Sequence, residues 1–289
     1  MGLRRWAETH PTGSGDGQRG VGFSPPLLMG VLNVTPDSFS DGGLHADPVE
    51  AGRRLLAAGA DIIDVGGEST RPGAALVPAE EEQRRVVPVI RALAQEGARV
   101  SVDTRNASTM RAALEAGAQI VNDVSGLGHD PASLPFLAGW DCPVILMHMR
   151  GTPQTMASLA VYDDVVVEVA AELAACVERA VAGGIALGRI AIDPGLGFAK
   201  TAEQSLAVLR GLERFMALGM PVLVGASRKG FIGALGGEPD PRLRAPGSIA
   251  AALFGAANGA SIIRVHDVAE TAQALRVWRS LTEPRYPSP

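Results

Sequence analysis

Residues 99–124 read RVSVDTRNASTMRAALEAGAQIVNDV, and this stretch contains the unit that decides the fold. A short β-branched run ends in the polar Asp103, a segment of helical period follows, Gly117 closes that segment, and a second β-branched run begins at once. Strands that are joined by helices in this way must be parallel. The stretch therefore predicts one βαβ unit of a parallel sheet.

The same alternation runs along most of the chain. We expect strands near residues 27, 61, 99, 119, 143, 189, 221 and 261, with helices between them such as 78–97, 106–117 and 163–184, several of which end at a glycine. About eight such units close into a (β/α)₈ barrel, whereas an open doubly wound sheet usually carries a glycine-rich dinucleotide fingerprint that MGVLNVTPDSF at 29–39 lacks. We predict an α/β fold, a single TIM barrel over residues 25–289, after a flexible tail over 1–24.

Composition limits the classes of function. The 289 residues are 46% hydrophobic and carry a formal net charge of −5, so the broad positive field of a nucleic-acid-binding protein is not expected. No apolar run reaches the roughly 18 residues of a membrane span. Cys142 and Cys176 match no metal or redox spacing, which favours reduced thiols in a cytoplasmic protein. Small molecules are the expected partners.

Polar residues stand at nearly every expected strand end, where the active site of a barrel forms. Each has an ordinary explanation by itself: Asp123 or Asp267 could cap a helix, His148 could be a satisfied core histidine, and Arg228 could pair with a carboxylate on the rim. Together on one face they indicate a site, whose members are Asn33, Asp64, Asp103, Asn122, Asp123, His148, Asp193, Ser227, Arg228, Lys229, Arg264 and His266.

The residue types suggest the shape of a ligand. Asp103, Asn122 and Asp193 above an apolar floor favour a planar ring with several N–H donors, because an unpaired buried carboxylate is costly. Lys229 adds a donor for a ring carbonyl. Arg264 and His266 are two residues apart on one strand, so they share a face and suit a phosphate or diphosphate.

These residues occur in motifs that resemble dihydropteroate synthase, the folate-pathway enzyme that sulfonamides target. The resemblance extends from about Leu28 to Val277 and is carried, in order, by GVLNVTPDSFSDGG, DVGGESTRPGA, SVDT, VNDVSG, VILMH, DPGLGFAK, GASRK and RVHDV.

The resemblance implies that 4-aminobenzoate attacks the methylene carbon of 6-hydroxymethyl-7,8-dihydropterin diphosphate, with Mg²⁺ as cofactor, in a homodimeric enzyme. It implies that Asn33 binds the metal and that Phe39 and Arg71 lie in loops that close over the aminobenzoate. The pterin would be held by Asp103, Asn122, Asp193 and Lys229 between Met147 and Phe198, and the diphosphate by Thr70, Arg264 and His266. The groups expected to take part in catalysis are Asp103, Lys229, Arg264 and His266.

One position departs from the family pattern. Gly230 follows SRK where many members have Ser, so contact with the aminobenzoate carboxylate would fall to the backbone N–H near a helix start. No inserted residue stands in TPDSFSDGG or STRPG, and we therefore predict sensitivity to sulfonamides.

Three alternatives remain at this stage. A methyltetrahydrofolate:corrinoid methyltransferase would share the pterin-binding acids but would not need the cations of SRK and RVHDV. A Schiff-base aldolase would use Lys229, with Arg228 lowering the pKa of that lysine. A non-catalytic pterin-binding protein would not need Asn33, Arg71, Arg264 and His266.

Overall fold

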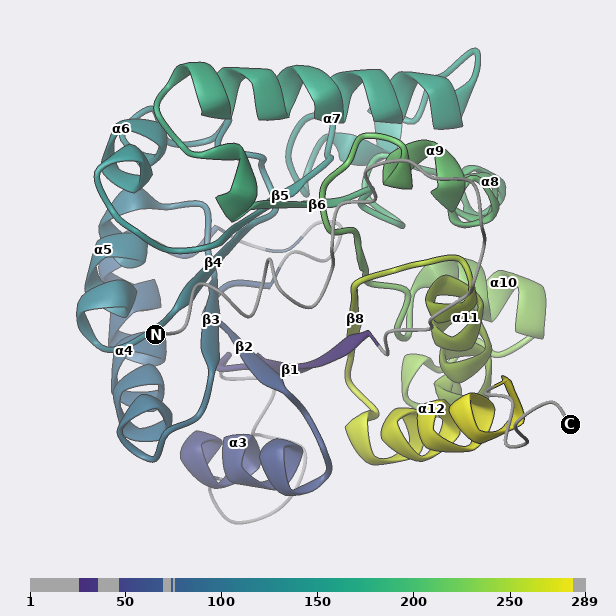
Figure 1. Ribbon diagram of the computed structural model, residues 1–289, viewed down its shortest axis with the longest axis horizontal. Coiled ribbons are helices and arrows are strands. Elements are labelled where there is room, and N and C mark those ends of the chain that lie inside the picture. The colour runs from purple at the N-terminus through teal and green to yellow at the C-terminus, as the bar shows by residue number, and fades with distance from the viewer. Residues whose placement is uncertain (1–25, 36–46, 70–73, 75, 283–289) are drawn as a thin grey trace, which may run out of the picture.

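The computed structural model describes residues 26–35, 47–69, 74 and 76–282. Within these residues the sheet has eight parallel strands in the order β6-β5-β4-β3-β2-β1-β8-β7, and a parallel bridge between Ile192 and Val222 joins its two edges into a barrel (Figure 1). The predicted barrel is confirmed; the tail expected over 1–24 lies outside the described residues. The strands are β1 (Leu27–Asn33), β2 (Ile62–Gly66), β3 (Val100–Asp103), β4 (Ile120–Asp123), β5 (Val144–Met147), β6 (Ile190–Asp193), β7 (Leu223–Val224) and β8 (Ile262–Val265).

Helices surround the sheet and connect successive strands (Figure 1). Three of them are followed by the glycines that the sequence marked, and Gly97, Gly117 and Gly184 adopt φ of 85°, 111° and 103°, a region that favours glycine. Among the described residues no helix is long and apolar enough to cross a membrane. The helices are α3 (Pro48–Ala57), α4 (Ala79–Gln95), α5 (Ala107–Glu115), α6 (Ser133–Ala138), α7 (Val165–Ala182), α8 (Ala202–Arg210), α9 (Leu212–Met216), α10 (Gly230–Gly236), α11 (Ala245–Ala257) and α12 (Val268–Thr282), with 3₁₀ turns at Met156–Leu159, Leu187–Arg189 and Pro241–Leu243.

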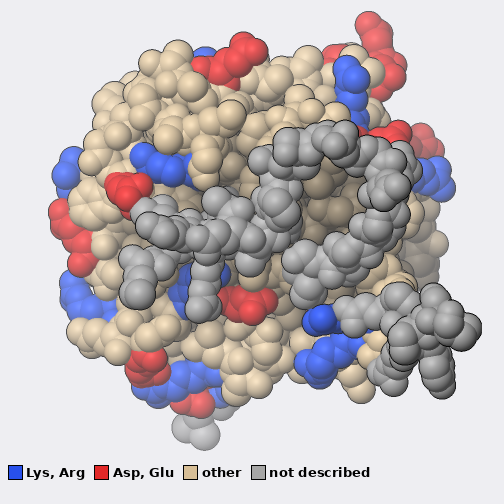
Figure 2. Space-filling view, in the orientation of Figure 1, with Lys and Arg blue, Asp and Glu red and all other residues tan. Residues whose placement is uncertain are grey.

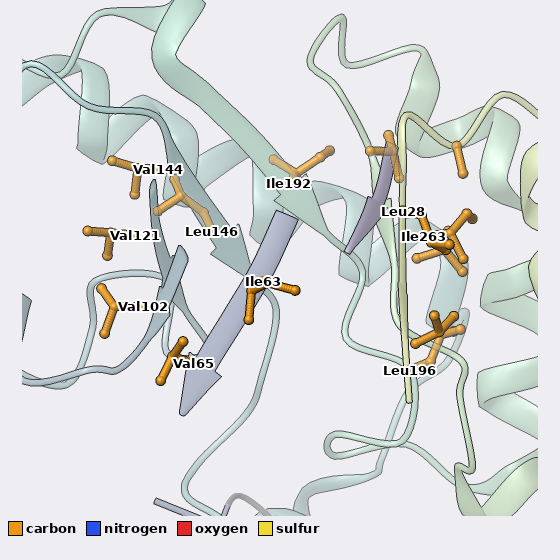
Figure 3. Packing of buried hydrophobic residues seen from close by; sticks show 14 of the residues in the cluster. Leu28, Ile63, Val65, Val102, Val121, Val144, Leu146, Ile192, Leu196 and Ile263 are labelled. Atoms are coloured by element: carbon orange, nitrogen blue, oxygen red, sulfur yellow. The ribbon is translucent and has the colours of Figure 1, made fainter. Parts of the chain in front are cut away.

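The main core lies between the strands and the helices. Figure 3 shows the side chains on this side of the barrel wall, among them the fully buried Val65, Val102, Val121 and Ile192. Because side chains of a strand alternate between its two faces, these outward residues fix which residues point into the barrel.

The barrel interior has an apolar floor beneath a polar layer. Its floor is a separate cluster of buried residues: Met29, Ile62, Ile120, Ile145, Ala191, Leu223 and Ile262. Two residues further along five of these strands, on the same face, stand Asp64, Asn122, Met147, Asp193 and Arg264. Period-two alternation therefore places charged groups directly above an apolar base.

The outer surface carries both signs of charge. On the face shown in Figure 2, acidic and basic side chains are interspersed around the periphery. This mixture agrees with the small net charge of −5.

Candidate active site

Arg264 is the centre of the polar layer. Its Nε donates to Asp64 Oδ2 at 2.7 Å and its Nη2 donates to Asp103 Oδ2 at 2.7 Å, while Asn122 Nδ2 donates to the same Asp64 oxygen at 3.0 Å. Strands β8, β2, β3 and β4 supply these groups, and the pair of Arg264 with Asp64 joins residues 200 apart in sequence. Barrel closure thus brings together three of the predicted residues, Asp103, Asn122 and Arg264.

Asp64 is the residue whose importance the sequence did not reveal. The sequence places it among the strand-end residues of the site but gives it no role, whereas its side chain is fully buried and accepts hydrogen bonds from both Arg264 and Asn122. Its inward position, two residues after Ile62 of the apolar floor, was the available signal.

Two predicted pterin ligands are carboxyl groups with raised pKa values. Burial raises the pKa of Asp103 to about 7, with Arg264 opposing and Asp64 reinforcing that shift. Burial likewise raises the pKa of Asp193, while a hydrogen bond from the Gly195 N–H to Asp193 Oδ1 at 2.7 Å acts in the opposite direction. Such groups gain most from a ligand that brings N–H donors.

Lys229 stands against an aromatic ring. Its Nζ lies 4.0 Å from the centroid of the Phe198 ring, a favourable cation–π distance. Burial, followed by repulsion from Arg264, lowers the pKa of Lys229 to about 8, so the ammonium form still prevails at pH 7. The aldolase alternative would have Arg228 lower this pKa, but Arg264 is the cation that does so, and the Arg228 guanidinium pairs with the Asp267 carboxylate, as its ordinary explanation predicted.

An apolar wall borders the charged groups. Met147 and Phe198, the two residues predicted to line a ring, pack in one cluster with Val124, Met156 and Ala199. The contact between Lys229 and Phe198 places this wall next to one of the predicted pterin ligands.

Glycine keeps the mouth open. A β-carbon built on Gly225 would lie 3.8 Å from Asp193 Oδ2, and one built on Gly66 would lie 3.7 Å from both Asp103 Oδ2 and Asn33 Oδ1. A side chain at either position would fill space beside the acids. Because both of these oxygens lie near the same point beside Gly66, the Asn33 amide oxygen faces the same mouth as Asp103.

His266 is held by a residue just after β7. The His266 N–H donates to Ser227 Oγ at 3.1 Å, and the same hydroxyl lies 3.0 Å from His266 Nδ1. Burial, with Arg264 and Arg228 nearby, lowers the pKa of His266 to about 3, so the ring is neutral at pH 7. When the Ser227 hydroxyl donates to Nδ1, the ring proton is on Nε2 and is available to an acceptor.

The described residues contain no cluster of three or more His, Cys, Asp or Glu side chains that could hold a metal ion. A metal site built entirely from such side chains is therefore not present among the described residues. Mg²⁺ commonly takes only one or two protein oxygens and completes its shell with phosphate and water. The single amide oxygen of Asn33 fits that second arrangement.

Some expected residues have other roles or cannot be placed. Asp123 accepts the backbone N–H groups of Ser125 and Leu127 at 2.7 and 3.2 Å in the turn after β4. The helix cap suggested for Asp123 is wrong, because the next helix, α6, begins only at Ser133. His148 is a buried histidine with two hydrogen-bond partners, as its ordinary explanation predicted. The predicted residues Phe39, Thr70 and Arg71 lie outside the described residues.

The model of the family described as pterin binding enzyme matches residues 29–266. The chain belongs to the pterin-binding enzyme family.

Within that family the relatives are consistent in name. Dihydropteroate synthase of Escherichia coli K12 is 47% identical over 259 residues, which are 88% of this chain and 91% of the relative. The Xanthomonas albilineans dihydropteroate synthase with 4-aminobenzoic acid superposes with a TM-score of 0.84 at 48% identity, over 91% of this chain and 95% of that one. The Yersinia pestis enzyme with a sulfonamide drug superposes with a TM-score of 0.84 at 43% identity, over 91% and 97%. The resemblance that the motifs predicted is confirmed, and with it the assignment of this pterin-binding chain as a transferase.

Proposed function

We propose that the chain joins 6-hydroxymethyl-7,8-dihydropterin diphosphate to 4-aminobenzoate, forming 7,8-dihydropteroate and diphosphate for folate biosynthesis. One observation carries this proposal: the mouth of the barrel combines two carboxyl groups, an amide and a lysine with the apolar wall of Met147 and Phe198, and an arginine and a neutral histidine stand beside them. The family and the relatives described above support the same reaction.

The pterin ring occupies the slot between the apolar wall and the acids. Its amino group and ring N–H groups donate to Asp103, Asp193 and the Asn122 amide oxygen, since Asn122 Nδ2 is already engaged with Asp64. Lys229 donates to the ring carbonyl from its position over Phe198. Each contact supplies a donor or an acceptor that a buried group requires.

The diphosphate lies on the side of Arg264 and His266. Arg264 keeps its positive charge because burial is outweighed by Asp64 and Asp103, and neutral His266 donates through Nε2 to a phosphate oxygen. Thr70 belongs to the same predicted contact set. A Mg²⁺ ion held by Asn33 would neutralise charge on the diphosphate as it departs.

The chain's residues stabilise the leaving group more than they activate the nucleophile. We propose substantial cleavage of the C–O bond before the amine bonds, because the methylene cation is conjugated with the electron-rich pterin and Arg264 and His266 stabilise the charge that develops on diphosphate. The neutral aniline nitrogen needs no general base. A bridging ¹⁸O isotope effect near unity, with chemistry shown to be rate-limiting, would contradict this order of bond changes.

The reaction is tested by diphosphate release from the purified protein with dihydropterin diphosphate and Mg²⁺, with and without 4-aminobenzoate. We expect release that requires 4-aminobenzoate and yields 7,8-dihydropteroate. Binding of dihydropterin diphosphate with no release in either case would instead establish a non-catalytic pterin-binding protein. Two further assays test whether Asn33 is the metal ligand: one omits Mg²⁺ from the wild-type reaction, and the other adds Mg²⁺ to the Asn33→Ala variant.

We also propose a cytoplasmic homodimer that pairs through its late helices. Large apolar side chains are exposed on this part of the chain, on α10, α11, α12 and the turn between α10 and α11: Leu235, Leu243, Phe254, Val277 and Leu281. A second copy would cover them. We expect light scattering of the purified protein to give twice the chain mass and Val277→Lys to give the monomer; a monomeric wild type would contradict this proposal.

The free, buried Cys142 and Cys176 support a reducing compartment.

Sulfonamides should inhibit the enzyme competitively with 4-aminobenzoate. The absence of an inserted residue in the two loop motifs and the drug complex of the Yersinia pestis relative support this expectation. Turnover that is unchanged at high sulfamethoxazole would show that Gly230 or another difference has altered the aminobenzoate contact.

A further inference from the structure

Lys200 is a buried lysine that the reaction described above does not use. Lys200 is 8% exposed, and its Nζ donates to the carbonyl oxygens of Gly195 at 3.1 Å and Phe198 at 3.0 Å. The third partner is His148 Nδ1, at 2.9 Å. Burying an ammonium is costly, and burial lowers the pKa of Lys200 to about 7, so this arrangement needs an explanation.

The loop that Lys200 holds has an unusual backbone. Between β6 and Lys200, three residues adopt positive φ: Gly195 at 68°, Gly197 at 78° and Ala199 at 47°. A left-handed alanine costs about 1 kcal/mol, so contacts outside the backbone must hold this loop in place. The hydrogen bonds of Lys200 to two of its carbonyls supply such contacts.

The same loop sets two groups of the pterin slot. Gly195, whose carbonyl Lys200 binds, donates its N–H to Asp193 Oδ1 at 2.7 Å and so orients that carboxyl group. Phe198, whose carbonyl Lys200 also binds, presents its ring 4.0 Å from Lys229 Nζ. One buried cation therefore lies behind both the acid and the aromatic wall of the slot.

The other side of Lys200 is tied to a helix. In its charged form Lys200 can only donate, so His148 Nδ1 then accepts from it, and the His148 Nε2–H donates to Glu172 Oε2 of α7 at 2.9 Å. Burial, with repulsion from Lys200, lowers the pKa of His148 to about 4 and keeps the ring in the neutral form that this chain of bonds requires. Arg150 in turn pairs with Glu172 and with Glu168.

We propose that Lys200 is a positioning residue for the pterin slot, anchored through His148 to Glu172, and that it holds the 194–199 loop so that Asp193 and Phe198 face the ring. The role rests on the proposed reaction, since it assigns to Lys200 the geometry of the pterin subsite and none of the chemistry. Lys200 contacts no substrate in this arrangement; it acts through Gly195 and Phe198.

The chain offers a matched control at the other end of the same strand. Arg189, just before β6, also binds two backbone carbonyls: its Nε donates to Cys142 O at 2.8 Å and its Nη2 donates to Leu137 O at 2.9 Å. Lys200→Met and Arg189→Met each remove a cation from two carbonyls, but only Lys200 lies at the mouth. A role in stability alone would affect both variants alike.

The experiment measures the Kd for 6-hydroxymethyl-7,8-dihydropterin diphosphate by calorimetry, the KM for each substrate, and Tm. For Lys200→Met we expect the Kd and KM for the pterin substrate to rise at least tenfold, while the KM for the aminobenzoate stays within twofold. Arg189→Met should lower Tm and leave the pterin Kd within twofold. A Lys200→Met protein that folds and binds the pterin substrate like the wild type would overturn the proposal.

A second variant covers the case in which Lys200→Met does not fold. His148→Leu removes the anchor and leaves Lys200 its two carbonyls, so we expect the pterin Kd to rise several-fold; an unchanged Kd would overturn the anchored arrangement. Failure of the reaction itself is distinguishable, because the wild type and Arg189→Met would then release no diphosphate with 4-aminobenzoate.

Discussion

Replacing Asp64 should test whether the charge network at the mouth stabilises the barrel. Asp64 Oδ2 accepts from Arg264 Nε at 2.7 Å and from Asn122 Nδ2 at 3.0 Å, and the side chain is fully buried. Asp64→Ala leaves Arg264 with Asp103 as its remaining carboxylate and leaves a buried amide donor without a partner. Two hydrogen bonds to a charged group are worth about 1.5–3 kcal/mol each, and breaking a buried ion pair costs about 3–5 kcal/mol.

We therefore expect the free energy of unfolding to fall by about 3–5 kcal/mol, or Tm by about 6–10 °C, in urea and thermal unfolding followed by circular dichroism. Asp64→Asn keeps one acceptor and should lose about 2 kcal/mol. Asp61→Ala is the control, because the side chain of the exposed Asp61 accepts one hydrogen bond, from the Leu28 N–H at 2.8 Å, and its loss should cost about 1 kcal/mol or less.

The refuting results are specific. If the free energy of unfolding of Asp64→Ala is within about 0.5 kcal/mol of the wild-type value, the network does not stabilise the fold. If the effects of Asp64→Ala and Arg264→Met simply add, the two residues are not coupled, whatever their separation in the structure.

Three other sites allow direct tests. Gly195→Ala, whose β-carbon would lie 2.0 Å from His148 O at φ of 68°, should lose about 2 kcal/mol or more in urea unfolding, whereas Gly188→Ala, with open space, should match the wild type. Asp103 titrates near pH 7 in the free protein, above its ordinary value of 3.8, so its contribution to stability falls as pH rises between about 4 and 7. N–H donors of the pterin favour the carboxylate form of Asp103. The Kd for the pterin should therefore fall as pH rises to about 7, and binding should release a proton. A calorimetric binding enthalpy that does not depend on the ionisation enthalpy of the buffer would contradict this. Buried Cys142 and Cys176, whose pKa values burial raises, should react with a thiol reagent only after unfolding; reaction of either in the native protein would refute their burial.

Much of this site could be predicted because it follows from local chemistry. The polar residues at the ends of short apolar runs mark the mouth of the barrel, and Asp103, Asn122 and Asp193 could be named from that position and from the family motifs. The glycines after the helices could be named too, since a left-handed residue after a helix is a local requirement.

Partner choice was decided only by the tertiary structure. Arg264 was expected to face an anion, and it does stand at the mouth, but closing the barrel also pairs it with Asp64, a residue 200 positions away. Lys200 and His148 lie 52 residues apart and form one buried contact. No sequence pattern specifies such pairs, because they depend on which strands become neighbours.

The sequence by itself determined the barrel, the polar ends of its strands and the family, because strand period, glycine placement and motif order are properties of the chain. The tertiary structure decided the protonation of the site. Desolvation is the largest cause of the raised pKa of Asp103 and of the lowered pKa values of Lys229 and His266. Burial exists only after strands and helices have packed, so the same residues in an extended chain would carry none of these shifts.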